Sequence, residues 1–403
     1  MDDTKTSLYF LQRNLFLELS KDLQNEFQNV LQVIDITFPL SAKHRTGLPR
    51  DVAELSRQLT SGRSDRVDGY LGKAASRSAY LRYFLPWNVF RLLRLLPSLN
   101  IDLHDGDVIC DLGSGPLTFA IALWISRPDL RKLNLEIRCV DRTAPVLEAG
   151  KKLFYAIAGV SSSWKIKTIR GSLGTEIFGE PAALVTAINV YNELFWDDRN
   201  DLGKIVKKEK NYLLSLVKKS GSVLVVEPGI PRSGEFISQL RESLLSSAAI
   251  IAPCPHREKC PFPGGKRGTK WCHFSFDTND APSRLHSLSK ASGLPKEKAV
   301  LSFMYAKINS QKDEVVQEKK LQEAVLKARI ISDAIVLGGN TTKQSGIKSD
   351  VQYGRYACSA QGMILIAGKK QSIEHIPSGT LIDIKTQSKR TDVKTGAPLF
   401  EIL

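Results

Sequence analysis

The sequence predicts an α/β protein whose main domain is a doubly wound, Rossmann-like sheet. Between residues 101 and 310, short apolar runs alternate with helical stretches, a pattern typical of parallel βαβ units. A glycine-rich turn follows the first apolar run, where such sheets bind nucleotides. The expected strands are 107–112, 135–140, 166–169, 183–188, 222–227 and 299–308. The expected helices are 116–126, 144–158, 200–219 and 234–248.

A helical region is expected before the sheet, over residues 1–100. Apolar side chains at three- and four-residue steps indicate one amphipathic helix. These side chains are Phe16, Leu19, Leu23, Phe27, Leu31 and Ile34. A second, short helix is expected at 51–60. Residues 63–94 then hold seven Lys or Arg and six aromatic side chains, which suit phosphates and stacked bases but equally suit a packed helical core.

The last part of the chain, 311–403, is expected to form a charged helix at 313–329 and a small, basic, β-rich domain. Its strands are predicted from short β-branched runs at 330–337, 356–357, 363–366 and 381–384. Residues 342–395 hold nine Lys or Arg against four acidic residues, which predicts a basic surface. The expected domains are therefore 1–100, 101–310 and 311–403.

Bulk composition limits the class of protein. The 403 residues are 42% apolar and 25% charged, as in soluble globular proteins. They contain no apolar stretch of about twenty residues that would span a membrane. The acidic start, Met1-Asp2-Asp3, argues against a secretory signal or transit peptide, so the expected location is cytoplasmic. The net charge of +15 favours a polyanionic partner, with RNA the first candidate and a merely basic enzyme the alternative.

The turn after the first strand carries the candidate cofactor site. Its glycines let the backbone approach a ligand, and the following helix offers N–H groups. Asp141, which ends the next strand, can accept hydrogen bonds from both hydroxyls of a ribose. An acid before Gly-x-Gly resembles the first motif of S-adenosylmethionine-dependent methyltransferases, although Leu117 replaces the usual third glycine in the path of the cofactor's amino-acid portion. The candidate cofactor-binding residues are Asp111, Gly113, Gly115, Asp141, Ser172 and Asn189, and no catalytic residue is assigned.

Three of the six cysteines fall within nineteen residues of a proline-rich loop at 253–275: Cys254, Cys260 and Cys272. Thiolates this close most simply serve as metal ligands. Cys110 and Cys139 lie in predicted strands and are interpreted as buried apolar residues, which leaves Cys358 as a distant fourth ligand. Four thiolates suit a [4Fe–4S] cluster or a structural zinc, and in a zinc site His256 or His273 could substitute.

The chain resembles the mitochondrial-type small-ribosomal-subunit methyltransferase-like family, as a bacterial-like member, over about residues 70–380. The segments that carry the resemblance are Pro253–His256, Cys260-Pro261, Trp271–Ser275, Asp111–Thr118, Glu227–Gly229 and Cys358-Ser359. The resemblance implies a methyltransferase fold and a [4Fe–4S] cluster held by Cys254, Cys260, Cys272 and Cys358. It also implies binding to the small ribosomal subunit and its rRNA during assembly.

The expected function is therefore that of an rRNA-binding assembly factor, monomeric off the ribosome and without a membrane. One alternative is an active S-adenosylmethionine-dependent RNA methyltransferase, and another is a zinc-stabilised RNA-binding protein. A radical or redox iron–sulfur enzyme is disfavoured, because the Cys-x3-Cys-x2-Cys spacing of radical enzymes is not present.

Overall fold

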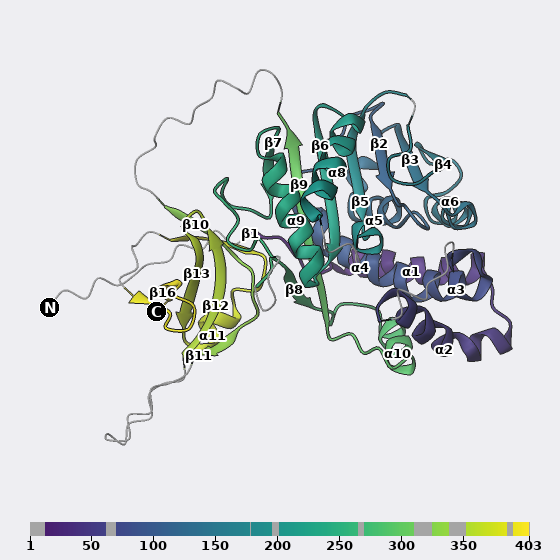
Figure 1. Cartoon of the computed structure of the whole chain (residues 1–403). Helices are drawn as coiled ribbons and strands as arrows, with labels where there is room; N and C mark the ends of the chain where they lie inside the picture. The colour runs from purple at the N-terminus through teal and green to yellow at the C-terminus, as the bar shows by residue number, and fades with distance from the viewer. Residues whose placement is uncertain are drawn as a thin grey trace. The chain divides into compact units, whose positions relative to one another are not determined.

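The structure is a computed structural model, and it describes residues 13–61, 70–177, 179–195, 201–264, 270–309, 325–337, 352–384 and 390–402 (Figure 1). The chain forms two compact units. One consists of Leu17–Pro228 and Asp277–Ala299, and the other of Met1–Phe16, Gly229–Phe276 and Val300–Leu403. Both units draw on distant parts of the chain. The predicted domain limits, which follow chain order, stay a prediction.

The main sheet has the doubly wound order that the sequence predicts. Its path runs Trp164–Arg170 (β4), Leu135–Asp141 (β3), Val108–Leu112 (β2), Ala182–Ile188 (β5), Val217–Pro228 (β6), Lys298–Ile308 (β9) and Ala248–Ala252 (β7), with Phe274–Asp277 (β8) beside β9. Strands β2 to β6 pair in parallel, and β7 is antiparallel to β9. This is the strand order of the S-adenosylmethionine-dependent methyltransferase fold. The order reverses between β2 and β5, where such sheets open a crevice for a ligand.

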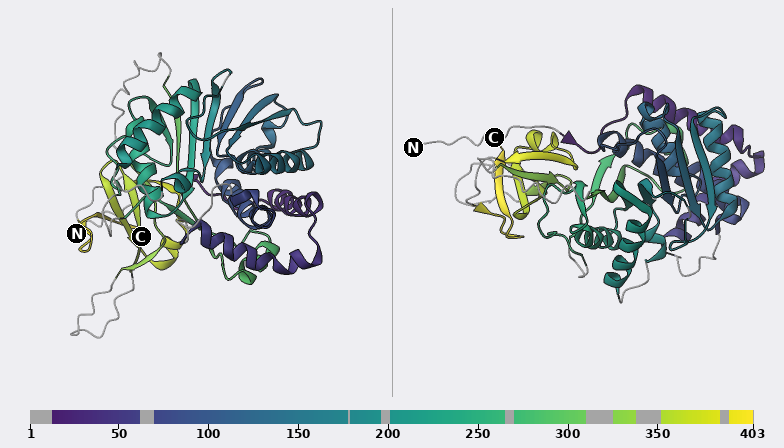
Figure 2. Two further views of the ribbon diagram at one scale, coloured as in Figure 1. Left: turned by 45° about the vertical axis from the view of Figure 1, so that its right-hand side comes forward. Right: turned by 90° about the horizontal axis from the view of Figure 1, so that it is seen from above.

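Helices lie on both faces of this sheet (Figure 2). They are Thr118–Ser126 (α5), Ala144–Ala158 (α6), Tyr191–Leu194 (α7), Leu202–Leu216 (α8) and Pro231–Leu244 (α9). Ser283–Ala291 (α10) packs instead against the N-terminal helices (Figure 1). The predicted helix 200–219 was wrong at its end, because Val217 already pairs with Ala182 as the start of β6. Lys218 and Lys219 are exposed and make the start of β6 as polar as the surface of a helix, which is why the sequence predicted a helix there.

The described part of the N-terminal region is mostly helical, as predicted. The first helix begins only at Lys21, so the prediction was wrong for Phe16 and Leu19, which precede it. Its elements are Lys21–Thr37 (α1), Ala42–Leu59 (α2), Tyr70–Gly72 (η2), Ala74–Ala79 (α3), the π-helical turn Tyr80–Phe84 (η3), Leu85–Leu95 (α4) and Leu96–Ser98 (η4). The second helix begins well before the predicted residue 51. Tyr83, Trp87 and Phe90 are buried, so these rings of the basic aromatic stretch form core rather than a surface for bases. Residues 62–69 of that stretch lie outside the described residues.

A second sheet contains the C-terminal strands. Its path is Arg13–Asn14 (β1), Thr380–Ile384 (β14), Leu326–Ile330 (β10), Gln352–Ser359 (β12), Gly362–Gly368 (β13), Pro398–Ile402 (β16) and Arg390–Thr391 (β15), with Ile335–Leu337 (β11) beside β12 and Lys370–Glu374 (α11) after β13. The predicted helix 313–329 was wrong at its end, where β10 pairs with both β12 and β14. Isoleucines from β10, β13 and β14 fill the core, and residues 310–324 lie outside the described residues.

Candidate functional site

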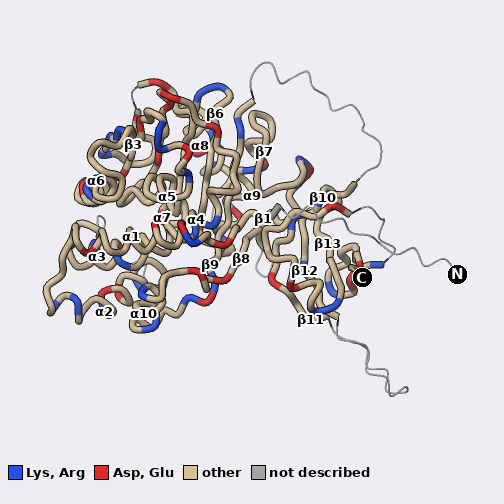
Figure 3. The backbone as a smooth tube through the Cα atoms, turned by 180° about the vertical axis from the view of Figure 1, so that it is seen from behind, with Lys and Arg blue, Asp and Glu red and all other residues tan. Residues whose placement is uncertain are grey.

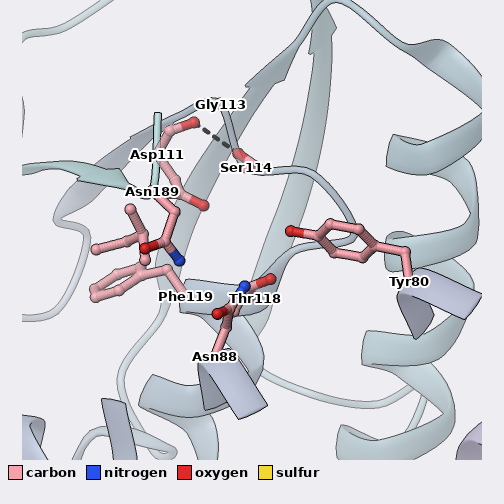
Figure 4. A pocket seen from close by; sticks show the side chains of 9 residues that line it. Tyr80, Asn88, Asp111, Gly113, Ser114, Thr118, Phe119 and Asn189 are labelled. Carbon is pink, nitrogen blue, oxygen red and sulfur yellow. Dashed lines mark hydrogen bonds between the residues drawn. The ribbon is translucent and has the colours of Figure 1, made fainter. Parts of the chain in front are cut away.

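A small cavity lies at the carboxyl ends of β2 and β5, where the strand order reverses (Figure 4). Its volume is about 10 Å³, room for roughly one water molecule. The residues that line it are Tyr80, Asn88, Asp111, Gly113, Ser114, Thr118, Phe119, Ile188 and Asn189. Three of the six predicted cofactor residues, Asp111, Gly113 and Asn189, therefore meet at one site.

Two oxygen acceptors at this cavity have no hydrogen-bond partner in the described part of the chain. Thr186 donates to Asp111 Oδ1 at 2.6 Å, which leaves the buried Oδ2 unpaired. Asn189 Oδ1 is likewise buried and unpaired, on a residue with a φ of 56°. Burial raises the pKa of Asp111 to about 7, and the nearby Asp141 adds to that rise. Two unpaired acceptors suit a ligand group that donates hydrogen bonds, such as an ammonium group.

We expect Asp111→Asn to become more stable relative to the parent protein as the pH rises. The pKa of about 7 in the folded protein lies above the ordinary value of 3.8, so ionisation of Asp111 costs folding stability between those two pH values. The parent should therefore lose about 2–3 kcal/mol relative to the variant between about pH 5 and about pH 8. Urea unfolding at both pH values measures this difference, and parallel pH profiles would contradict it.

The other predicted cofactor residues do not line the cavity. Asp141 Oδ2 accepts from Gly115 N at 3.1 Å and Oδ1 from Thr143 N at 2.8 Å, so this carboxylate holds the glycine loop. Ser172 is exposed, and its backbone N–H donates to Thr175 Oγ1 at 2.9 Å. Their roles in binding a cofactor stay predictions.

Leu117, which the sequence places in the path of the cofactor's amino-acid portion, does not face the cavity. It has a φ of 61°, is fully buried and does not line the cavity. Its side chain lies instead towards α6, where a Cβ built on Gly150 would be 2.7 Å from Leu117 Cδ1. The left-handed backbone turns this side chain into the core.

Gly150→Ala is therefore expected to destabilise the fold strongly. The added Cβ would lie 2.5 Å from the backbone carbon of Pro116, which cannot move without displacing the glycine loop. We expect a loss of about 3 kcal/mol or more in the free energy of unfolding. Chemical denaturation measures it, with Gly203→Ala, where a Cβ meets nothing within 4 Å, as the control. Equal stability of the two variants would contradict the packing of Leu117.

Tyr80 and Asn88 close the cavity from the N-terminal helices, and sequence analysis missed both. Figure 4 shows their side chains reaching towards Asp111 and Thr118. Tyr80 begins the π-helical turn, whose extra residue shifts the side chains off the regular helical period. Arg91 donates to Asn88 Oδ1, and burial raises the pKa of the Tyr80 phenol. A helical periodicity read from the sequence could not have placed Tyr80 at this site.

Glu227, at the end of β6, holds the turn that carries Asn189. Its Oε1 accepts from Val190 N (3.0 Å) and Tyr191 N (2.9 Å), and its Oε2 from Asn192 N (3.0 Å). With its amide turned to fit, Asn192 Nδ2 also donates to Oε2 at 2.9 Å. Burial raises the pKa of Glu227 to about 8, and the N–H donors oppose that rise. This carboxyl group is a structural anchor for the cavity wall.

The cysteine loop is fixed by one face of α9. Gly234, Ser238 and Arg241 follow at steps of four and three residues, so they share that face. A Cβ on Gly234 would lie 3.1 Å from Cys272 O, and Cys260 Sγ lies 3.6 Å from Ser238 Oγ. Arg241 donates to two carbonyl oxygens of the loop, at 2.8 and 2.6 Å. The helix thus positions the loop backbone.

The four predicted ligands are neighbours within one unit. Burial raises the pKa of Cys272 well above its usual value, and the nearby Cys254, Cys358 and Cys260 raise it further. Cys358 Sγ lies 3.2 Å from His256 Nε2. Cys110 and Cys139 are buried in β2 and β3, as predicted. Thiols from distant parts of the sequence are therefore neighbours: those of Cys254, Cys260, Cys272 and Cys358.

The outer face of β12 meets this loop through several further contacts. Arg329 is the register partner of Cys358, and its Nε donates to Pro253 O at 3.0 Å. Lys270 Nζ lies 3.3 Å from the centre of the Tyr356 ring. These contacts tie the Cys254 segment to the strand that carries Cys358.

Across the described ranges, no three His, Cys, Asp or Glu side chains are arranged as a metal ion requires. The thiols are neighbours rather than a formed cage. The chemistry of the donor set fits a metal, because thiolates are the soft ligands that zinc and iron–sulfur clusters take. Burial raises the pKa of Cys254 to about 11, so a metal would have to displace thiol protons on binding.

The family described as mitochondrial small ribosomal subunit Rsm22 matches residues 88–345. The chain belongs to this family. The match spans the cavity, except for Tyr80, and the cysteine loop, whereas Cys358 lies beyond it. No curated protein matches the chain.

Solved structures with the same kind of fold are distant. TrmN from Thermus thermophilus is 12% identical, with a TM-score of 0.33 over 56% of this chain and 52% of its own. Magnesium protoporphyrin IX methyltransferase from Synechocystis, solved with bound S-adenosylmethionine, is 10% identical, with a TM-score of 0.30 over 51% and 71%. A methyltransferase from Pyrococcus furiosus is 8% identical, with a TM-score of 0.30 over 52% and 78%. Among the described residues of our chain, no helix is long and apolar enough to cross a membrane.

Proposed function

We propose that this protein binds the small ribosomal subunit and its rRNA during assembly, as a cytoplasmic monomer when off the ribosome. The Rsm22 family match over residues 88–345 carries the proposal, because the family's description names the small ribosomal subunit of mitochondria. The net charge of +15 supports a polyanionic partner. The methyltransferase-like sheet serves as the scaffold.

The second sheet supports contact with RNA. Its strands β14, β10, β12, β13 and β16 follow the order of oligonucleotide-binding barrels, with β13 parallel to β16 and α11 before β14. Figure 3 shows Lys and Arg spread over many elements of the described chain. The predicted basic surfaces at 63–94 and 342–395 lie partly outside the described residues and stay predictions.

A scaffold role fits the cofactor cavity better than catalysis does. The cavity holds about 10 Å³, whereas sites for small ligands typically measure roughly 300–1,000 Å³. S-adenosylmethionine could bind only after Tyr80 and Asn88 move. The unpaired oxygens of Asp111 and Asn189 favour the alternative, an active RNA methyltransferase, because they suit the ammonium group of that cofactor.

The cysteine site is proposed to hold a [4Fe–4S] cluster through Cys254, Cys260, Cys272 and Cys358, with zinc as the alternative. A bound cluster would fix β12 against the loop on α9 and contribute to the stability of that unit. Iron, sulfide and zinc analysis after anaerobic purification distinguishes the two metals. About four irons per chain without zinc supports the cluster, and one zinc supports the alternative.

Sedimentation with ribosomal precursors tests the main proposal. We expect the protein to comigrate with immature small subunits and to dissociate as salt is raised, because phosphate contacts release counterions. Migration only in the light fractions at low salt would overturn it.

Isothermal titration with S-adenosylhomocysteine tests the catalytic alternative. If the site is a closed cofactor pocket, Tyr80→Ala should bind at least about tenfold more tightly than the parent, since the phenol no longer fills it. Absence of binding by both proteins, together with no methyl transfer to small-subunit RNA, would leave the scaffold role.

A further inference from the structure

A second cavity lies among α1, α2, η3 and α10, within the unit Leu17–Pro228 and Asp277–Ala299. Its volume is about 270 Å³, far larger than that of the cofactor cavity. Its lining residues are Leu31, Ile34, Arg45, Leu48, Pro49, Arg82, Arg284, Leu285 and Leu288. The family match begins after the first three of these elements, and neither the cofactor cavity nor the cysteine loop shares these residues.

Most of this lining is apolar. Leu31, Ile34 and Leu285 are almost fully buried and come from two different helices, and Leu48 and Leu288 are half-buried. An aliphatic chain placed there would leave water for a preformed apolar surface.

The polar part of the lining is entirely cationic. Arg82 is only 4% exposed, and its Nε lies 3.2 Å from Asp35 Oδ1. Arg284, which is half exposed, pairs with the same carboxylate. Arg45 is exposed and makes no ion pair within the described part of the chain. Two guanidinium groups thus pair with Asp35, and Arg45 is the third cation of the lining. Figure 3 shows basic segments on both α2 and α10.

We propose that this cavity binds an amphiphilic anion, a small molecule with a carboxylate or phosphate head and an aliphatic chain of octyl to decyl length. Guanidinium groups bind such heads through paired hydrogen bonds. Arg45 is exposed, and Arg284 donates to Asp35 through only one of its nitrogen atoms, which leaves other N–H groups of its guanidinium for a ligand. The volume accommodates the chain, and the leucines of α1 and α10 surround it. This site is independent of the proposed ribosomal function.

Isothermal titration of the full-length protein tests the proposal with octanoate and octyl phosphate. We expect at least one of them to bind with a Kd below about 1 mM, and their ratio identifies the preferred head group. Octanol should bind at least about tenfold more weakly, since it lacks the charge. Acetate and inorganic phosphate, which lack the chain, should show no binding. Equal binding of octanol and the anions, or no binding of either anion, would overturn the proposal.

Matched variants locate the site. Arg45→Gln and Arg284→Gln should each weaken binding about tenfold, since each removes a charged hydrogen-bond donor. Arg50→Gln is the control, because Arg50 is on α2, pairs with Asp51 and does not line the cavity. Leu288→Trp should abolish binding by filling the cavity. If Leu288→Trp instead leaves octanoate binding intact, the cavity is not the binding site.

Discussion

Cys358→Ser is expected to abolish binding of the proposed [4Fe–4S] cluster and to destabilise the unit that contains the cysteine loop. Cys358 is one of the four neighbouring thiols and is the donor furthest from the others in sequence. A site with one thiolate fewer should not retain a [4Fe–4S] cluster, and the free energy of metal binding is then lost from folding. We expect less than about a tenth of the parent's metal and a fall in Tm of about 10 °C or more.

Cys139→Ser is the matched control. Cys139 is as buried as Cys358 and also lies within a strand, but it belongs to β3 of the main sheet, in the other unit. Burying its hydroxyl should cost about 1–3 kcal/mol without removing metal. Metal content and visible absorption separate the two variants even if both are less stable. Full metal content in Cys358→Ser would show that Cys358 is not a ligand.

The sequence predicted the main sheet well because its strands are short, apolar and separated by helices of regular period. All five parallel strands lie within one or a few residues of their predicted positions. The errors fall where pairing partners decide the structure. Val217 belongs to a strand because it pairs with Ala182. Leu326–Ile330 form a strand because they pair with β12 and β14. Neither partner is visible from local periodicity.

The candidate sites divide in the same way. The cysteines could be found because their residue type and spacing already restrict their chemistry. Sequence analysis could not predict where the side chains of Leu117, Tyr80 and Asn88 lie, because their directions depend on backbone geometry. A left-handed φ turns Leu117 towards Gly150, and a π-helical turn directs Tyr80 into the cavity. The sequence therefore indicated where the candidate cofactor cavity lies, but not how small its volume is.

Glu227→Gln is expected to lower the free energy of unfolding by about 2–4 kcal/mol. Four N–H donors of residues 190–192 converge on its two carboxyl oxygens. An amide keeps the shape but must turn its own NH₂ group towards some of these donors. Urea unfolding measures the loss, and Glu148→Gln on the exposed surface of α6 is the control.

The same variant separates a structural role from a ligand-binding one. Asn189 is carried on the turn that Glu227 holds, so loss of the anchor should disturb the cavity as well as the stability. If Glu227 instead served a ligand, Glu227→Gln would bind ligand more weakly but unfold at the parent's urea concentration. Burying a carboxyl group is costly unless it is hydrogen-bonded, and Glu227 accepts hydrogen bonds from four N–H donors. A Glu227→Gln variant as stable as the parent would therefore show that Glu227 does not anchor the turn that carries Asn189.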